Sequence, residues 1–383
     1  MRNVRVQLFA AAMLLTLRAS LIGAAAEPDT ETRFHRPRLQ IINGGNSPID
    51  VFWLKMPDER VPHGSVEPGK YTVVTTTLGH RFAIVNREDK SESFVASEVL
   101  VQAFHFGGVP AIYTQRANAE GFPVVASDRV NPHALREAVH IINRMLARRP
   151  DVRSAMIKSG SRLCILAYNE FTTDLPEWAQ LAEGTVPGFE DVSARDYYDA
   201  RARGMGGSET DPFCSCGEEN LLGYEGDPYR AENILIHELA HNIHLRGMNN
   251  VDPTFDRRLK AAFDAAMSDG LWKGKYASVN HHEYFAEAVQ SWFDDNREND
   301  HDHNHVNTRV ELTDYDPRLA ALCKEVFGDT EFRYTKPATR LTGHLAGYDA
   351  STASKFEFPA RLKEARNRIR AAAEQRSAKG SGK

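Results

Sequence analysis

The chain has 383 residues, of which 42% are hydrophobic and 26% are charged, and its formal net charge at pH 7 is −5. This length is enough for two domains or one large one, because single hydrophobic cores stop growing near roughly 250–300 residues. The composition is ordinary for a soluble globular protein, and the lack of a net basic charge argues against a nucleic-acid partner.

The N-terminus has the features of a secretory signal peptide in their usual order. Two arginines in MRNVR precede an apolar run at 8–17, and small residues follow as far as Ala26. We therefore predict a signal peptide over residues 1–26 and secretion to the periplasm or outside the cell. The alternative is a membrane anchor, but Arg18 interrupts the apolar run well short of the roughly 20 residues that span a bilayer. No later segment is apolar and long enough for stable membrane insertion.

Export permits disulfide bonds, and the chain has an even number of cysteines. They are Cys164, Cys214, Cys216 and Cys323. Four cysteines allow three pairings. The sequence is compatible with one long-range bridge but does not select its partners.

Residues 34–100 have the pattern of a small all-β domain. Short β-branched and aromatic runs such as LQIIN, VFWL, YTVVTTT and RFAIV are separated by the turn-forming segments GGNSP, MPDE and EPGK. This spacing predicts a β-sandwich.

From about residue 130 the apolar residues change to a helical period. We predict a helix in 131–150, a buried strand at 162–168, a helix at 254–269 and another after Asn280. The strand could offer an edge to an extended peptide. The basic segment 360–383 can begin as a helix, but we expect it to end as a disordered tail. The fold class expected for the whole chain is α+β.

The stretch ILIHELAHNIHLRG, residues 234–247, contains the pattern H-E-x-x-H. Residues four apart on a helix lie one turn apart on the same face, so His237 and His241 direct two imidazoles toward one point. Glu238 lies on the flank of that face, where it can reach a water molecule without taking a ligand position. This arrangement is typical of zinc peptidases.

The third ligand must come from elsewhere in the chain. The metzincin pattern requires glycine at 244 and histidine at 247, but the chain has His244 and Gly247, and we expect Gly247 to end the helix. A glutamate from a second helix is the other common solution, and Glu283 follows His241 by 283 − 241 = 42 residues. The competing interpretation is a capping box between Asn280 and Glu283. Glu287, one turn later, favours a buried polar role for this face.

The segment YASVNHHEYFAE, together with the preceding H-E-x-x-H, resembles the catalytic domain of the anthrax lethal factor-like zinc peptidases, which use a glutamate ligand. The resemblance covers residues 230–295 and implies a mostly helical, zincin-like domain with a small sheet over 101–345. It also implies a role for each of six residues: His237, His241 and Glu283 as zinc ligands, Glu238 as general base, Tyr276 as hydrogen-bond donor to the oxyanion, and Glu287 as a partner of the ligands.

These residues predict a secreted zinc metallopeptidase in which Glu238 takes a proton from the attacking water and Tyr276 stabilises the oxyanion. A zinc amidase acting on a cell-wall or other non-protein amide would use the same residues. A protein-binding module stapled by zinc is a third hypothesis, against which the intact Glu238 argues. Of the remaining histidines, His244 is expected to pack or to contact substrate. The loop 295–305, with three histidines, could hold a second metal but is more typical of a solvated loop.

Residues 36–98 resemble the β-domain of the von Hippel–Lindau protein, on the basis of Asn43, Trp53, the E-P-G turn and L-G-H-R-F. His80 matches a residue of that family's peptide-binding pocket. Elsewhere in the pocket, the family's tyrosine, serine and tryptophan are replaced by His63, Thr76 and Phe82. The resemblance implies a sandwich that either binds a protein ligand or is a structural accessory, without the family's own ligand.

Overall fold

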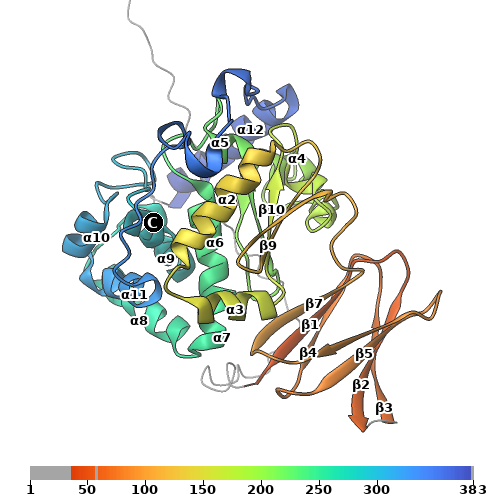
Figure 1. Ribbon diagram of the computed structural model, residues 1–383. Helices are drawn as coiled ribbons and strands as arrows, with labels where there is room; N and C mark the ends of the chain where they lie inside the picture. The colour runs from red at the N-terminus through yellow and green to blue at the C-terminus, as the bar shows by residue number, and fades with distance from the viewer. Residues whose placement is uncertain (1–35, 57–58, 381–383) are drawn as a thin grey trace, which may run out of the picture.

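The computed structural model of the chain describes residues 36–56 and 59–380 (Figure 1), so the predicted signal peptide lies outside the described residues. This part of the chain combines helices with three sheets, and the α+β fold expected from the sequence is confirmed. Figure 1 shows an all-β module, drawn in orange, beside a larger part that contains the helices. Among the described residues, no helix combines the length and the apolar character needed to cross a bilayer.

The N-terminal module is the predicted sandwich. Its two sheets have the strand orders β4-β1-β7 and β3-β2-β5-β6. Buried side chains from both sheets, such as Leu39, Ile41, Val51 and Ile84, pack against one another between them. The strands are β1 (Arg38–Asn43), β2 (Ile49–Met56), β3 (Glu59–Val66), β4 (Tyr71–Thr75), β5 (Arg81–Asn86), β6 (Glu92–Ala96) and β7 (Val101–Phe106).

The sandwich extends one strand beyond the predicted boundary at residue 100. β7 pairs in parallel with β1, from Arg38 opposite Val101 to Asn43 opposite Phe106. A parallel pair joins segments distant in the chain, so its partner cannot be recognised from local sequence.

The larger part is built on a sheet of order β11-β12-β10-β9-β8. β9, β10 and β12 run parallel, whereas β8 and β11 pair antiparallel at the two edges. β10 is central and all of its residues are buried, so the prediction that it offers an edge to a peptide is wrong. The short strand β11 instead forms the edge of the sheet that lies beyond β12. The strands are β8 (Gln115–Ala119), β9 (Phe122–Ala126), β10 (Arg162–Leu166), β11 (Gly204–Met205) and β12 (Phe213–Gly217).

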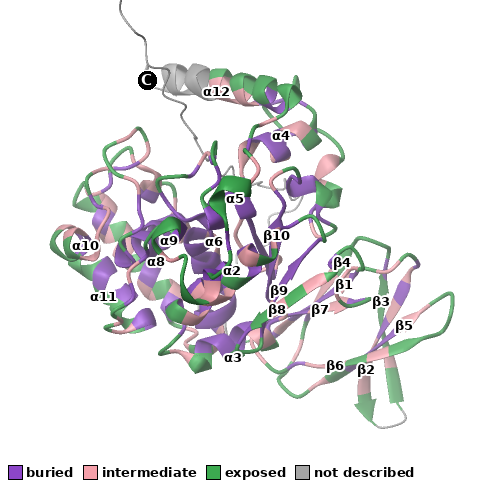
Figure 2. Ribbon diagram, turned by 45° about the horizontal axis from the view of Figure 1, so that its top comes forward, coloured by how far each residue is buried: buried purple, intermediate pink, exposed green. Residues whose placement is uncertain are grey.

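Helices α2, α3 and α6 cover one face of this sheet. Phe122, Val124 and Leu163 belong to the core that these helices share, whereas Val125 and Cys164 pack on the other face. Figure 2 shows buried residues gathering around β10, α6 and α9. The helices are α2 (Pro132–Met145), α3 (Pro150–Lys158), α4 (Ala194–Arg201), α5 (Glu218–Leu222), α6 (Ile234–Asn242), α7 (Asn249–Val251), α8 (Phe255–Ser268), α9 (His281–Trp292), α10 (Arg309–Tyr315), α11 (Pro317–Phe327) and α12 (Ala360–Gly380).

Gly247 does not end the helix that carries the histidines, contrary to the prediction. After α6 the chain continues as a wider helical segment, Ile243–Met248, and then as α7. A Cβ on Gly247 would lie 2.6 Å from Cγ1 of Val152, which is too close for any contact. Glycine is therefore required here because α3 packs against this backbone, and not because the helix stops.

The C-terminal segment, expected to end as a disordered tail, forms α12 as far as Gly380. Leu362 and Ala365 are buried on this helix and pack with Tyr197 and Ala200 of α4. The segment is mostly basic and polar, so its sequence did not predict that a few apolar side chains would hold its first turns against α4.

All four cysteines are buried and free, so the compatible disulfide bridge does not form. Three of them lie in the neighbouring strands β10 and β12, where their side chains contribute to the core of the sheet.

The β-module contacts the larger part at α7 and at segment 204–211. The Asn250 side chain accepts a hydrogen bond from Val101 N at 2.7 Å and donates one to Val101 O at 3.0 Å. The Gln40 amide donates to the carbonyl of Thr210 at 2.7 Å. These contacts fix the module beside segment 204–211.

Candidate metal centre

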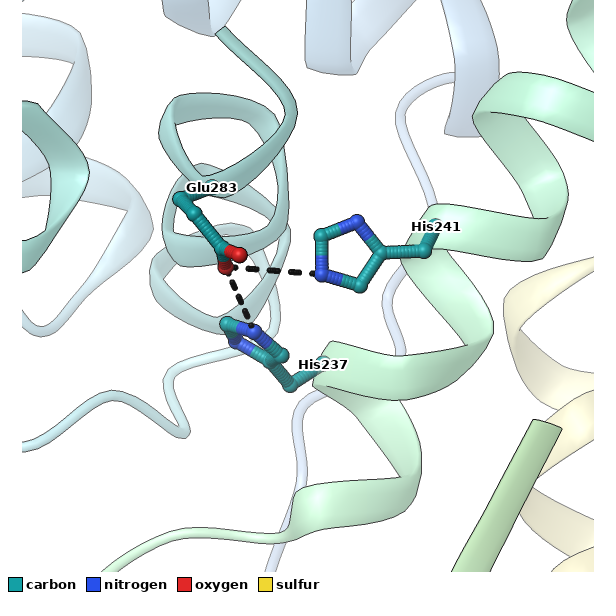
Figure 3. Close-up of side chains that lie close together, drawn as sticks. All are labelled: His237, His241 and Glu283. Atoms are coloured by element: carbon teal, nitrogen blue, oxygen red, sulfur yellow. Dashed lines mark hydrogen bonds and ion pairs between the residues drawn. The ribbon is translucent and has the colours of Figure 1, made fainter. Parts of the chain in front are cut away.

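Two histidines of α6 and a glutamate of α9 meet at one point in a cleft (Figure 3). Nε2 of His237 lies 3.2 Å from Oε2 of Glu283, and Nε2 of His241 lies 3.4 Å from the same oxygen. All three residues are buried. The structure therefore brings together the three residues predicted as metal ligands.

The geometry and chemistry of these donors suit zinc. Ligands bound to zinc at tetrahedral angles with bonds of about 2.0–2.1 Å lie about 3.3 Å from one another. The separations of 3.2 and 3.4 Å between the carboxylate oxygen and the ring nitrogens are close to that value. Two imidazoles with one carboxylate are also a donor set that catalytic zinc sites use.

Glu283 is free for this role because Asn280 caps α9 by itself. The Asn280 side-chain oxygen accepts hydrogen bonds from His282 N at 2.8 Å and Glu283 N at 3.0 Å. The Glu283 carboxylate lies beside His237 and His241 instead of closing a capping box. The competing structural interpretation of Glu283 is therefore wrong.

A residue that the sequence did not single out fixes the orientation of His237. Nδ1 of His237 donates to Oε1 of Gln290 at 2.9 Å, and the Gln290 amide in turn donates to Glu232 at 2.9 Å. A hydrogen bond at Nδ1 leaves the lone pair of Nε2 for a metal ion. Gln290 stands seven residues after Glu283 on the same stripe of α9, and this spacing was the available signal.

The electrostatics of the site favour a positive charge between the donors. Burial lowers the pKa of His237, but its hydrogen bond with Glu283 and the nearby carboxylates outweigh burial and raise the pKa to about 10. Burial raises the pKa of Glu283, but His241 and His237 bring it well below its ordinary value. A proton or a metal ion at this point therefore stabilises the buried carboxylate.

Glu238 and Tyr276 border the same cleft. A Cβ placed on Gly204 or Gly206 would lie 2.9 Å from a Glu238 oxygen, so this carboxylate lies directly beneath the backbone at β11. Burial raises its pKa. The ring centroid of Tyr276 lies 6.2 Å from that of His237, and burial raises the pKa of the tyrosine hydroxyl well above its ordinary value. Tyr276 therefore keeps its proton near neutral pH and can donate a hydrogen bond.

The cleft has a volume of about 570 Å³. Its lining comes from α6, from segment 201–211 with β11, from the stretch 276–287 and from the loop 297–303, and Arg38 of the β-module also borders it. The candidate ligands, the candidate base and the candidate hydroxyl donor thus share one open space.

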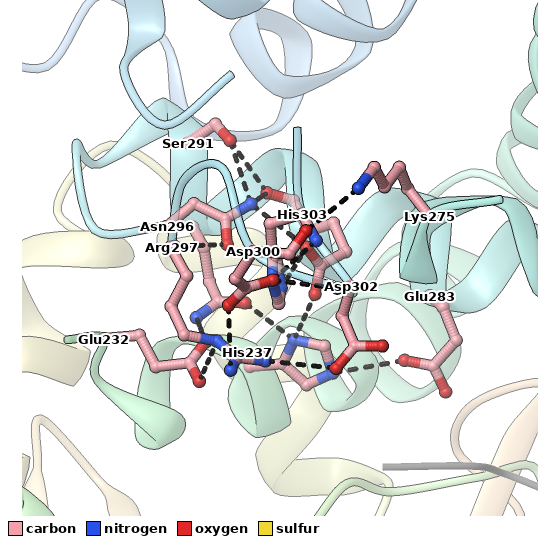
Figure 4. Close-up of polar contacts among 12 residues, drawn as sticks. Glu232, His237, Lys275, Glu283, Ser291, Asn296, Arg297, Asp300, Asp302 and His303 are labelled. Atoms are coloured by element: carbon pink, nitrogen blue, oxygen red, sulfur yellow. Dashed lines mark hydrogen bonds and ion pairs between the residues drawn. The ribbon is translucent and has the colours of Figure 1, made fainter. Parts of the chain in front are cut away.

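The histidine-rich loop, residues 295–305, is solvated only in part: His301 and His305 are exposed, as the sequence favoured, but His303 is buried. His303 is only 4% exposed. Its Nδ1 lies 2.8 Å from Oδ1 of Asp300 (Figure 4). Its Nε2 lies 3.2 Å from Oε2 of Glu287. Burial lowers the pKa of His303, but these two carboxylates raise it to about 10, so the ring is cationic at neutral pH. Glu287 also lies 3.6 Å from Nδ1 of His237, which links the loop to a candidate ligand.

The same loop supports Tyr276. The backbone N–H of Tyr276 donates to the carbonyl of Asp302 at 2.8 Å. Arg297 anchors the loop through ion pairs with Glu232 at 3.0 Å and Asp300 at 3.1 Å. The three histidines of the loop do not form a metal-binding group with one another among the described residues.

His244 belongs to a separate buried cluster. Its Nε2 lies 2.9 Å from Oδ1 of Asp256, and Nε2 of His281 lies 3.0 Å from the same oxygen. His244, Asp256 and His282 have the proximity that a metal ion requires. However, Asp256 already pairs with two imidazoles, so the group is satisfied without an ion, and His244 does not line the cleft.

No model of a known protein family and no curated protein matches this chain. The chemistry of the cleft is therefore inferred from its own side chains. They provide three donors for a cation, a carboxylate that can accept a proton and a hydroxyl that can donate a hydrogen bond.

Proposed function

We propose that the protein is a zinc-dependent peptidase. The observation that carries the proposal is the convergence of His237, His241 and Glu283 beside the Glu238 carboxylate in one open cleft. A structural zinc is normally enclosed by four protein ligands, whereas a catalytic zinc keeps one position open. Among the described residues, the candidate ligand group has three members. This number supports a catalytic zinc over a structural zinc that only holds two helices together.

Each side chain then has a defined task. His237, His241 and Glu283 would hold the zinc ion, which when bound would supply a water molecule of lowered pKa and polarise a carbonyl group. Glu238, whose carboxylate borders the same cleft, would accept the proton of the attacking water and deliver it to the leaving amine. The Tyr276 hydroxyl donates a hydrogen bond to the developing oxyanion. Gln290 and Glu287 hold His237 in position for the metal.

The edge strand β11 supports a peptide as substrate. It pairs with β12 on one side only, and the residues from Gly204 to Gly207 line the cleft. An extended peptide can add to such an edge through main-chain hydrogen bonds. The missing side chain of Gly206 brings this backbone close to His241 and Glu238, so a peptide on this edge would pass over them.

The proposal also includes secretion of the protein. It further includes recognition of a protein substrate by the β-module. Arg38 of the module borders the cleft, which supports a role in substrate contact. A zinc amidase would use the same side chains, but no feature of the cleft favours it over a peptidase.

The proposal is tested by incubating the zinc-loaded chain with a diverse peptide mixture and identifying the fragments by mass spectrometry. Glu238→Gln at matched zinc content is the control, because it removes the base without removing a ligand. We expect fragments from the wild type and a loss of rate of about 100-fold or more in the variant. Equal cleavage by both proteins would overturn the mechanism, and no cleavage by either would exclude a peptidase of broad specificity.

A further inference from the structure

Three arginines border the cleft, and two of them are neutralised by carboxylates. Arg38 pairs with Glu209 at 2.8 Å, and Arg297 pairs with Glu232 at 3.0 Å. Arg201 makes no side-chain hydrogen bond or ion pair with any residue that the structure describes, and its Nε is buried without a partner. A buried donor without an acceptor is unfavourable. An anion bound to this guanidinium would supply the missing acceptor.

Arg201 is unpaired because its neighbours are occupied elsewhere. Asp199 on the same helix lies 3.4 Å from Arg361. Arg203, two residues later, is fully buried and paired with Glu219 at 2.6 Å, so it is structural. Arg201 ends α4 just before β11, and it lines the cleft instead.

Arg201 shares the cleft with Glu238 and Tyr276, the residues proposed to act on the substrate. It stands three residues before Gly204, whose backbone lies so close to Glu238 that a Cβ there would be 2.9 Å from Oε1 of this carboxylate. An anion bound by Arg201 would therefore lie near the scissile bond.

We infer that Arg201 is a carboxylate-binding residue of the cleft and that the substrate carries a carboxylate close to the bond that is cleaved. The guanidinium fork matches a carboxylate with two parallel hydrogen bonds. The carboxylate can be an aspartate or glutamate side chain or the C-terminus of a peptide. This inference rests on the proposed function.

The first test measures binding without turnover. Zinc-loaded chain carrying Glu238→Gln is titrated by calorimetry with succinate, glutarate and adipate, and with the monoamide of each. One carboxylate can reach the zinc and the second can reach Arg201, so we expect at least one diacid to bind about tenfold or more tightly than its monoamide. Adding Arg201→Gln should bring that ratio close to one, and Arg201→Lys should restore part of it. Arg195→Gln, on the same helix, should leave the ratio unchanged.

Equal binding of diacids and monoamides, or a preference that persists in Arg201→Gln at matched zinc content, would overturn the inference. The source of the carboxylate is then found with two sets of peptides given to the protein with Glu238 intact. One set has internal glutamate or glutamine and an amidated C-terminus, and the other has a free or amidated C-terminus and no acidic side chain. Cleavage that depends on Arg201 in either set supports the inference and names the source. An Arg201-dependent diacid preference without cleavage of any peptide would leave the inference standing and defeat the peptidase proposal.

Discussion

Replacing His303 with glutamine tests whether the 295–305 loop controls the metal centre. His303 is 4% exposed and Glu287 is 3% exposed, so their contact of 3.2 Å is almost fully removed from water. Breaking a buried ion pair costs about 3–5 kcal/mol, because one charge remains buried without its partner. We expect the free energy of unfolding of the metal-free chain to fall by about 3 kcal/mol, since Asn296 still donates to Glu287 at 3.1 Å.

The effect should also reach the zinc ligand. Without the cationic ring, the Glu287 carboxylate competes with Gln290 for the Nδ1 proton of His237, from which it is 3.6 Å away. Loss of a residue that holds a metal ligand in position typically weakens metal binding about 10–100-fold. We therefore expect the zinc Kd of the variant, measured by competition with a chelator, to be higher than that of the wild type by about this factor.

His301→Gln is the matched control, because it changes the same residue type on the same loop at a side chain that is 71% exposed. It should leave both zinc affinity and urea stability unchanged. The reasoning is refuted if His303→Gln binds zinc as tightly as the wild type, or if both variants lose the same affinity.

Three further outcomes follow from individual residues. Gly206→Ala should weaken zinc binding at least tenfold with unchanged circular dichroism, since its Cβ would lie 2.4 Å from Cδ2 of His241 and turn this ring away; an unchanged zinc Kd would contradict that contact. His140 stacks on His344 with ring centroids 4.0 Å apart, and burial together with the neighbouring positive charges lowers the pKa of His140 to about 4. The folded state then binds fewer protons than the unfolded state, so stability present above pH 6.5 is lost as the pH falls toward 4. His140→Gln should flatten urea stability between these pH values, and an unchanged pH profile would argue against this origin. Finally, the chain unfolded without reductant should expose four reactive thiols, whereas two would reveal a disulfide.

The residues of the metal site could be predicted because their geometry is largely local. A spacing of four residues on a helix places His237 and His241 together whatever the rest of the fold is. Glu283 required one long-range assumption, the return of the chain through a second helix, and the Asn280 cap left its carboxylate free to complete the group. The spacing of Gln290 from Glu283 was its only signal, and this spacing by itself does not distinguish a partner of a ligand from any other polar residue on the helix.

Features that depend on distant contacts could not be predicted from the sequence. The apolar run at 162–168 does not reveal that strands lie on both sides of it, and so the edge was assigned to the wrong strand. His303 belongs to a polar segment whose composition favours solvent, and only its ion pairs with Glu287 and Asp300 explain its burial. The first turns of α12 are ordered by a few apolar side chains against α4.

The central claim is that His237, His241 and Glu283 hold one zinc ion. The most direct test is the zinc content of the purified chain after dialysis against a weak chelator, compared with that of Glu283→Gln. We predict one zinc per chain for the wild type and close to none for the variant, with the same circular dichroism for both. A wild-type chain without zinc, or full retention of zinc by Glu283→Gln, would contradict the account.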